Sequence, residues 1–172
     1  MKLFVTVGLE NFPFDRLVEL IDLNVEKKLI PPPILSQTGH SAHEPRFCPW
    51  KRFLPFDEIL AYLEDADIIV CHAGVGTTLI ALSRGKIPIL FPRQARYNEH
   101  VDDHQKEFAY KMVELGKVLA AWEGEELIRQ IQNYKALVPA LKSRLSLSGL
   151  PRLEAHLKSL LYSYEKRKER RA

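Results

Sequence analysis

One short segment, residues 66–78, constrains the fold more than any other part of the chain. It joins an unbroken apolar run, Ile68–Cys71, to a histidine and a glycine-rich turn, and apolar residues continue at helical spacing from Leu79 to Arg84. An apolar run of this length is typical of a parallel strand covered on both faces. The segment therefore predicts a buried parallel strand that leads through a tight turn into a helix.

Strands and helices alternate in the same way along the rest of the chain. Apolar runs predict further strands at 3–7, 34–38, 87–91 and 118–121. Helical periodicity predicts helices at 12–21, 56–63, 101–115 and 123–134, with Phe108, Met112 and Leu115 facing inward in the third, and residues 47–54 are expected to be extended or irregular. This alternation predicts an α/β fold, a single Rossmann-like domain with a mostly parallel sheet whose ligands bind beyond the carboxyl ends of the strands.

Composition limits the domain count and the class of partner. With 172 residues, 46% hydrophobic and 27% charged, the chain has enough material for one domain with a real core. The net charge of +3 gives no general affinity for nucleic acid. Cys48 and Cys71 make no disulfide framework, the strand at the start leaves no room for a signal peptide, and no apolar run reaches the roughly 20 residues of a membrane span. We therefore expect a cytoplasmic protein.

Two parts of this domain are distinguished by sequence. Residues 1–149 carry the strand and helix alternation, and residues 150–172 predict an amphipathic helix with leucines at 153, 157, 160 and 161 on one face. We expect this helix to pack on the same domain. Its basic end, residues 165–172, is interpreted as a solvated tail, with weak contact to an anionic membrane as the alternative.

The glycine-rich turn is suited to bind an anion. Gly74 and Gly76 let the main chain approach a ligand, and the first N–H groups of the following helix lack internal partners and carry partial positive charge. Two other strand ends place glycine or polar loops on the same edge, at Thr6–Gly8 and at 37–41. A helix-entry turn that binds nothing remains the alternative interpretation.

Motif residues that the sequence does not contain narrow the choice of ligand further. A phosphate-binding loop of an NTPase requires Gly-Lys-Ser/Thr, and no lysine stands at the equivalent place. A dinucleotide fingerprint requires a third glycine, but Leu79 occupies that position, and the next strand ends in Pro92-Arg93. ATP hydrolysis is therefore not expected, and an NAD(P)-binding protein is disfavoured but kept as an alternative.

Residues 93–105 form a second polar cluster, which mixes donors and acceptors suited to hydroxyl groups. Asp102 and Asp103 are expected in the first turn of a helix, where acidic residues favour the dipole. His100 and His104 have the i, i+4 spacing of a metal pair, but the sequence lacks the glutamate of a His-Glu-x-x-His motif. We expect no metal.

These motifs together resemble the carboxyl-terminal, donor-binding domain of family 28 glycosyltransferases. The similarity covers about residues 3–120, and it is greatest to the small soluble subunit of split transferases, as in bacterial exopolysaccharide glycosyltransferases and the dolichol-pathway N-acetylglucosaminyltransferase. It rests on the following segments: residues 4–8, 14–17, 37–39, 72–77, 85–88, 92–93 and 99–105.

The resemblance implies three groups of binding residues for a UDP-sugar. The diphosphate would be bound by Gly8, His72, Gly74, Val75, Gly76 and Thr77. The donor sugar would be bound by Glu99, His100, Asp103, His104 and Gln105. Uracil or ribose would lie near Thr38, Gly39, Phe53 and Leu54, although core packing is the favoured interpretation for Phe53.

One departure from the family pattern concerns ribose. Many relatives have a glutamate on the helix after the glycine loop that binds the ribose hydroxyls, and Ile80 stands at the matching place here. Ribose must then be held otherwise. This replacement, together with the long 93–105 loop, is more similar to the bacterial exopolysaccharide subunits.

The resemblance implies a UDP-sugar-binding catalytic subunit that transfers a hexosyl group to a lipid-linked acceptor. A separate membrane-anchored chain would supply the acceptor half and the general base, so the catalytic residue is not assigned in this chain. No cofactor or metal is implied, because helix N–H groups would stabilise the departing diphosphate. The subunit would be recruited to the inner face of the membrane. A non-catalytic sugar-nucleotide-binding regulatory subunit is the alternative from another class.

Overall fold

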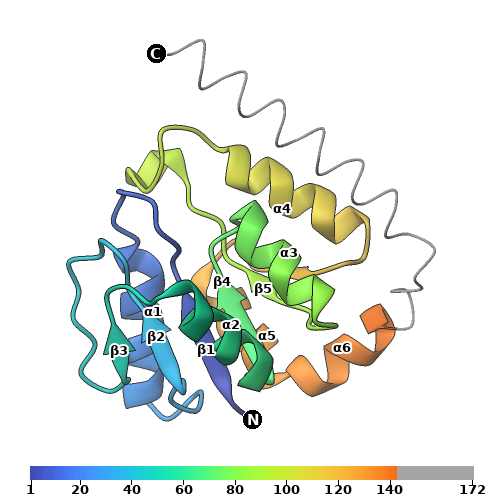
Figure 1. The fold of residues 1–172 in the computed structure, drawn as a ribbon, viewed down its shortest axis with the longest axis horizontal. Helices are drawn as coiled ribbons and strands as arrows, with labels where there is room; N and C mark the ends of the chain where they lie inside the picture. The colour runs from blue at the N-terminus through green and yellow to red at the C-terminus, as the bar shows by residue number, and fades with distance from the viewer. Residues whose placement is uncertain (143–172) are drawn as a thin grey trace.

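A computed structural model describes residues 1–142 as an α/β domain built on one six-stranded parallel sheet. Figure 1 shows the strands side by side in the centre, with helices around them. The strands follow the order β3-β2-β1-β4-β5-β6 and all pair in parallel. Their bounds are β1 Leu3–Thr6, β2 Leu35–Gln37, β3 Trp50–Lys51, β4 Ile68–Cys71, β5 Ile89–Leu90 and β6 Leu119–Ala120.

Helices cover both faces of the sheet, because side chains alternate between faces along each strand. Leu3 and Val5 point into a cluster shared with α1, α5 and α6, whereas Phe4 joins a second cluster with α2, α3 and α4. The single Rossmann-like domain expected from the sequence is confirmed. The helices are α1 Asp15–Glu26, α2 Phe56–Asp65, α3 Val75–Ser83, α4 His104–Glu114, α5 Gly124–Gln132 and α6 Tyr134–Lys142, with a short 3-10 helix at Ala95–Tyr97.

The sequence-based helix boundaries were wrong at several places. The first helix runs over Asp15–Glu26 and not over 12–21. α4 begins at His104 and not at Val101, because residues 98–103 form irregular turns held by side-chain contacts to the backbone. The apolar pattern at 123–134 continues, after a break at Asn133, into the unpredicted helix α6. α6 belongs to the core, since Tyr134 and Val138 are buried and Tyr134 donates its hydroxyl hydrogen to the Ile87 carbonyl oxygen.

Two side chains expected inside the protein lie on its surface. Leu115 is 40% exposed, because α4 ends at Glu114 and the chain leaves the helix there. Phe53 is 45% exposed and packs edge-on against His40, with ring centroids 5.0 Å apart, so the core-packing interpretation of Phe53 was wrong.

The strand order reverses between β1 and β4, and the region at the carboxyl ends of these two strands is called the crevice below. The chain proceeds outward from β1 to β2 and β3 on one side and from β4 to β5 and β6 on the other. Loops that leave the carboxyl ends of β1 and β4 therefore diverge to opposite sides, which is the usual binding position in open parallel sheets. Gly8 follows β1 and His72 follows β4, so the structure brings the two predicted strand ends together.

Residues 143–172 lie outside the part that the structure describes, and with them the predicted helix at 150–172 and its basic tail. Within residues 1–142, none of the helices combines the length and the apolar character needed to cross a bilayer.

Candidate functional site

The centre of the candidate site is the His72 ring, which lies between two glycines. An ideal Cβ atom at Gly8 would lie 2.3 Å from His72 Cε1, and one at Gly74 would lie 2.2 Å from His72 Nε2. Both distances are far below a van der Waals contact, so a larger residue at either position would displace the ring. Gly8 also has φ +78°, which disfavours other residues. The two predicted glycines therefore make room for the histidine.

His72 is a neutral imidazole over the physiological pH range. Burial, and next the positive charge of Arg93, lowers the pKa of His72 to about 3. Its Nδ1 atom is buried and has no hydrogen-bond partner among the described residues. Its Nε2 atom lies against both glycine backbones. Such a ring can supply one N–H donor to a ligand without carrying a charge.

The N-terminus of α3 follows this histidine directly. Gly74 occupies the N-cap position, no side chain caps this end of the helix, and the first turn contains no acidic residue. The N–H groups of Val75, Gly76 and Thr77 belong to the orphan donors of a helix start, where the dipole favours an anion. A Cβ at Gly76 would meet nothing within 4 Å. Open space therefore lies beside this first turn of the helix.

Gln37 fixes the backbone of Gly8 from the neighbouring strand. Its side-chain oxygen accepts hydrogen bonds from the Thr6 hydroxyl at 2.6 Å and the Gly8 N–H at 3.0 Å, and its amide donates to the Gly8 carbonyl oxygen at 2.9 Å. Gln37 was predicted only as part of the strand-end segment 37–41, with no role of its own. The signal in the sequence was its position two residues before Gly39, at the end of a predicted strand.

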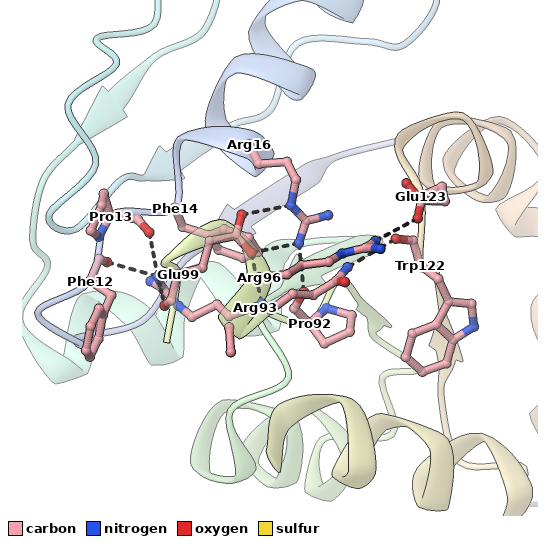
Figure 2. A network of polar contacts seen from close by, with 12 residues as sticks. Phe12, Pro13, Phe14, Arg16, Pro92, Arg93, Arg96, Glu99, Trp122 and Glu123 are labelled. Atoms are coloured by element: carbon pink, nitrogen blue, oxygen red, sulfur yellow. Dashed lines mark hydrogen bonds and ion pairs between the residues drawn. The ribbon is translucent and has the colours of Figure 1, made fainter. Parts of the chain in front are cut away.

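Arg93 ties the loop after β5 to the loop after β1, as Figure 2 shows. Its guanidinium donates to the carbonyl oxygens of Val7, Phe12 and Pro13 at 2.8, 2.9 and 3.0 Å, and lies 4.6 Å from the centre of the Phe14 ring. Burial lowers the pKa of Arg93 to about 10, so the group stays charged at neutral pH. The fully buried cation fixes the position of residues 7–13.

Glu99, predicted to bind the sugar, has its carboxylate engaged inside the protein. It accepts hydrogen bonds from Arg16 Nε and Nη2 at 2.8 and 2.9 Å, and from the Gln94 N–H at 2.9 Å (Figure 2). Arg16 also donates to the Pro92 carbonyl oxygen. Glu99 therefore orders the loop between β5 and α4, and Arg16 links that loop to α1.

Asp103 and Gln105 stand at the start of α4, and each holds part of the preceding loop. Asp103 Oδ1 accepts the Ala95 N–H at 2.9 Å, and Gln105 Oε1 accepts the Arg93 N–H at 3.1 Å. Gln105 is only 2% exposed, whereas Asp103 is exposed. The side-chain oxygen of Gln105 thus accepts a hydrogen bond within the protein, and its side-chain NH2 group remains to donate to a ligand.

His100, Asp102 and His104 form a compact group beside these residues. His104 Nδ1 contacts Asp102 Oδ1, and His100 Nδ1 lies 3.4 Å from the same oxygen. Burial opposes ionisation of Asp102, but its hydrogen bonds with His104 outweigh this effect and lower its pKa. Burial, then the neighbouring His104, lowers the pKa of His100. The two histidines are not stacked on one helix, as the i, i+4 spacing suggested, because only His104 is helical.

The residues assigned to uracil or ribose gather after β2. Thr38 and Gly39 are buried, and Thr38 Oγ1 is a buried hydroxyl without a hydrogen-bond partner among the described residues. Leu54 is buried, while Phe53 exposes its ring next to His40. The exposed Phe53 ring is a suitable surface for a planar base.

A separate surface hollow lies between α1 and the loop at 42–47. Its lining includes Asp22 and His43 but none of the residues discussed above except Arg16. Asp22 is buried and accepts hydrogen bonds from the Arg46 and Phe47 N–H groups. This carboxylate organises the loop, and we assign no ligand to the hollow.

The sequence profile of the glycosyltransferase family 28 C-terminal domain matches residues 2–146. The chain belongs to this family. No curated protein gave a significant sequence match. The family 28 domain accounts for most of the chain, and it includes the crevice, α3 and the 92–105 loop.

Solved glycosyltransferases share the fold of this family 28 domain. The glycotransferase of kitacinnamycin is 23% identical with a TM-score of 0.59, over 96% of this chain and 43% of its own. MurG of Acinetobacter baumannii is 20% identical with a TM-score of 0.54, over 84% and 45%. SnogD of Streptomyces nogalater is 19% identical with a TM-score of 0.53, over 85% and 39%. The chain thus spans less than half the length of these enzymes.

The packing of His72 predicts different effects for two neighbouring glycines of the family 28 domain. We expect Gly74→Ala to lower the free energy of unfolding by about 1–3 kcal/mol, because the new methyl group displaces the buried ring. Gly76→Ala should leave stability unchanged or raise it by up to about 1 kcal/mol, because alanine favours a helix and the site has space. Urea denaturation measures both, and equal losses would contradict the described position of His72.

Proposed function

We propose that this chain is the UDP-sugar-binding catalytic subunit of a two-component glycosyltransferase. The observation that carries the proposal is the region between β1 and β4, where Gly8 and Gly74 pack against the neutral His72, the start of α3 has no side-chain cap, and open space lies beside Gly76. Membership of family 28 supports a glycosyltransferase. The sugar, the acceptor and the partner chain belong to the proposal.

The diphosphate of the donor would lie at the N-terminus of α3. When the bond between the sugar and UDP breaks, negative charge develops on the leaving diphosphate, and preorganised donors stabilise that charge. The N–H groups of residues 75–77, the helix dipole and an N–H of His72 would act in this way. The buried Arg93 adds a fixed positive charge close to His72. Departure of the diphosphate then needs no metal at this position.

The two ends of the donor would occupy the flanking loops. Uracil would pack on Phe53 near the unpaired Thr38 hydroxyl, with Gly39 and Leu54 completing that side. The sugar would meet Asp103, His104 and the Gln105 amide at the start of α4, next to His100. Glu99 would act on the sugar through the loop that it orders. Ile80 offers no acceptor for ribose hydroxyls, so backbone groups would bind them.

A partner chain would supply the acceptor half. The structurally similar glycosyltransferases are more than twice as long as the part that this chain covers. We propose a membrane-anchored partner that binds a lipid-linked acceptor, carries the general base and recruits this subunit to the inner face of the membrane. Synthesis of exopolysaccharide or another cell-surface glycan is the process that such an acceptor implies. The basic residues at 166–171 would add a weak contact with anionic lipid.

The first test concerns the diphosphate. We expect Gly76→Val to reduce UDP binding at least tenfold, because its branched side chain would occupy the open space beside the first turn of α3, where the diphosphate would lie. Ser83→Val, at the other end of α3, is the matched control for a β-branched residue in the same helix and should bind UDP normally. Calorimetric titration with UDP and with NADH checks both. Unchanged UDP binding by Gly76→Val would reject the site, and preferential NADH binding would favour a dinucleotide protein.

The second test concerns the sugar. Gln105→Glu keeps an oxygen that accepts the Arg93 N–H but removes the amide donor. We expect it to weaken binding of the cognate UDP-sugar by at least tenfold and to leave UDP binding unchanged. The reason is that a sugar hydroxyl would lose the Gln105 amide N–H that donates to it, whereas UDP makes no such contact. A panel of UDP-glucose, UDP-galactose, UDP-glucuronate and UDP-N-acetylglucosamine identifies the cognate sugar first. Equal losses for UDP and UDP-sugar would place Gln105 away from the sugar.

The third test separates a catalytic subunit from a regulatory one. We expect sugar transfer to a lipid-linked acceptor only when this chain and its membrane-anchored partner are combined, and Gly76→Val should abolish that turnover. Turnover by the partner without this chain would support a regulatory role.

A truncation that removes residues 165–172 should keep UDP-sugar binding and lose sedimentation with anionic vesicles at low salt.

A further inference from the structure

Three side chains with metal-ligating atoms converge in the turn that precedes α4. His100 Nδ1 and His104 Nδ1 both face Asp102 Oδ1, the first at 3.4 Å and the second in direct contact. The three ligand atoms lie within 4.8 Å of one another, and the two imidazole rings meet edge to face with centroids 4.5 Å apart. Each residue thus directs a different ligand atom into one small volume.

We propose that His100, Asp102 and His104 form a binding site for a zinc ion or a similar first-row transition-metal ion. Two imidazole nitrogens and one carboxylate oxygen are common zinc ligands. Zinc bonds of about 2.0–2.2 Å at tetrahedral angles place neighbouring ligand atoms about 3.3 Å apart. The distance of 3.4 Å between His100 Nδ1 and Asp102 Oδ1 fits this spacing. The ion would replace the hydrogen that joins His104 to Asp102, and the part-exposed His104 ring would turn outward to the same spacing.

The backbone that carries the three ligands is already fixed by residues that are not ligands. Buried Glu99 holds the Gln94 N–H on one side, and Asp103 and Gln105 hold the Ala95 and Arg93 N–H groups on the other. The Phe12 ring packs against His100, with centroids 5.5 Å apart. A metal site gains affinity when neighbouring contacts fix its ligands in this way.

Three protein ligands leave at least one coordination position open. This is the arrangement of zinc sites that bind water or a substrate oxygen, whereas structural zinc sites use four protein ligands. Two of its ligands, His100 and His104, are also assigned to the donor sugar, whereas none of its ligands is among the helix N–H groups assigned to the diphosphate. Metal binding can be tested without any nucleotide, and its outcome is therefore independent of the proposed function.

A simpler role for Asp102 makes a different prediction. Asp102 Oδ1 also accepts the His104 N–H at 3.2 Å, which is a local contact at the start of a helix. If this contact is its whole role, the cluster should have no more affinity for a transition metal than the isolated surface histidines. Measured metal affinity therefore separates the two interpretations.

The experiment titrates the metal-free full-length chain with Co²⁺ and follows the visible absorption, then adds Zn²⁺ as competitor. We expect one Co²⁺ per chain with the strong absorption of a low-coordinate site, displaced by Zn²⁺. Asp102→Asn should weaken binding by at least the roughly 10- to 100-fold that loss of a supporting residue costs at known metal sites. Asp103→Asn is the matched control, because it changes the adjacent carboxylate and keeps an oxygen for the Ala95 N–H.

A measurement on the unmodified protein covers the case in which Asp102→Asn fails to fold. Histidine ring ¹⁵N spectra should show that Zn²⁺ shifts Nδ1 of His100 and His104 and leaves His40 and His43 unchanged. Absence of Co²⁺ binding would overturn the proposal. Equal affinities of Asp102→Asn and Asp103→Asn, or zinc shifts confined to other histidines, would also overturn it.

Discussion

The packing of one histidine ring between two glycines determines the geometry of the candidate site. His72 ends the central strand β4, and Gly8 and Gly74 approach it so closely that neither position tolerates a Cβ without movement of the ring. Gln37 on the neighbouring strand β2 then holds Gly8 through two hydrogen bonds and Thr6 through a third. The backbone after β1, the imidazole and the start of α3 are thereby placed together at the point where the sheet order reverses.

A buried charge network extends this constraint to the other side of the crevice. Arg93 is completely buried and binds mainly carbonyl oxygens, so its cation joins the loop after β1 to the loop after β5. The Glu99 carboxylate accepts hydrogen bonds from Arg16 of α1 and from the Gln94 N–H, so it joins α1 to the loop after β5. Removing one partner of such a network would leave a desolvated polar group, which is why these loops are expected to behave as one unit.

Local patterns in the sequence predicted the fold well, because each strand is a short apolar run and each crossover helix has its own stripe. They also identified Gly8, His72 and Gly74, whose positions follow from the strand ends. The local patterns failed where contacts between separate segments determine the structure. The start of α4 depends on Asp103 and Glu99, which accept hydrogen bonds from the N–H groups of residues 94–95. The exposure of Phe53 depends on its position near the edge of the sheet. Gln37 and Arg93 lie in the predicted segments 37–41 and 93–105, but their structural roles were missed, since most of their side-chain partners are distant in sequence, up to 86 positions away.

The proposed function depends most on the binding of a nucleoside diphosphate at the start of α3. Titration of ¹⁵N-labelled protein with UDP, followed through the amide resonances, tests this directly. The largest shifts should fall on Val75, Gly76 and Thr77, because these N–H groups would donate to the diphosphate. If UDP binds while these amides stay unchanged, or if it shifts no amide in the protein, the crevice between β1 and β4 is not the donor site.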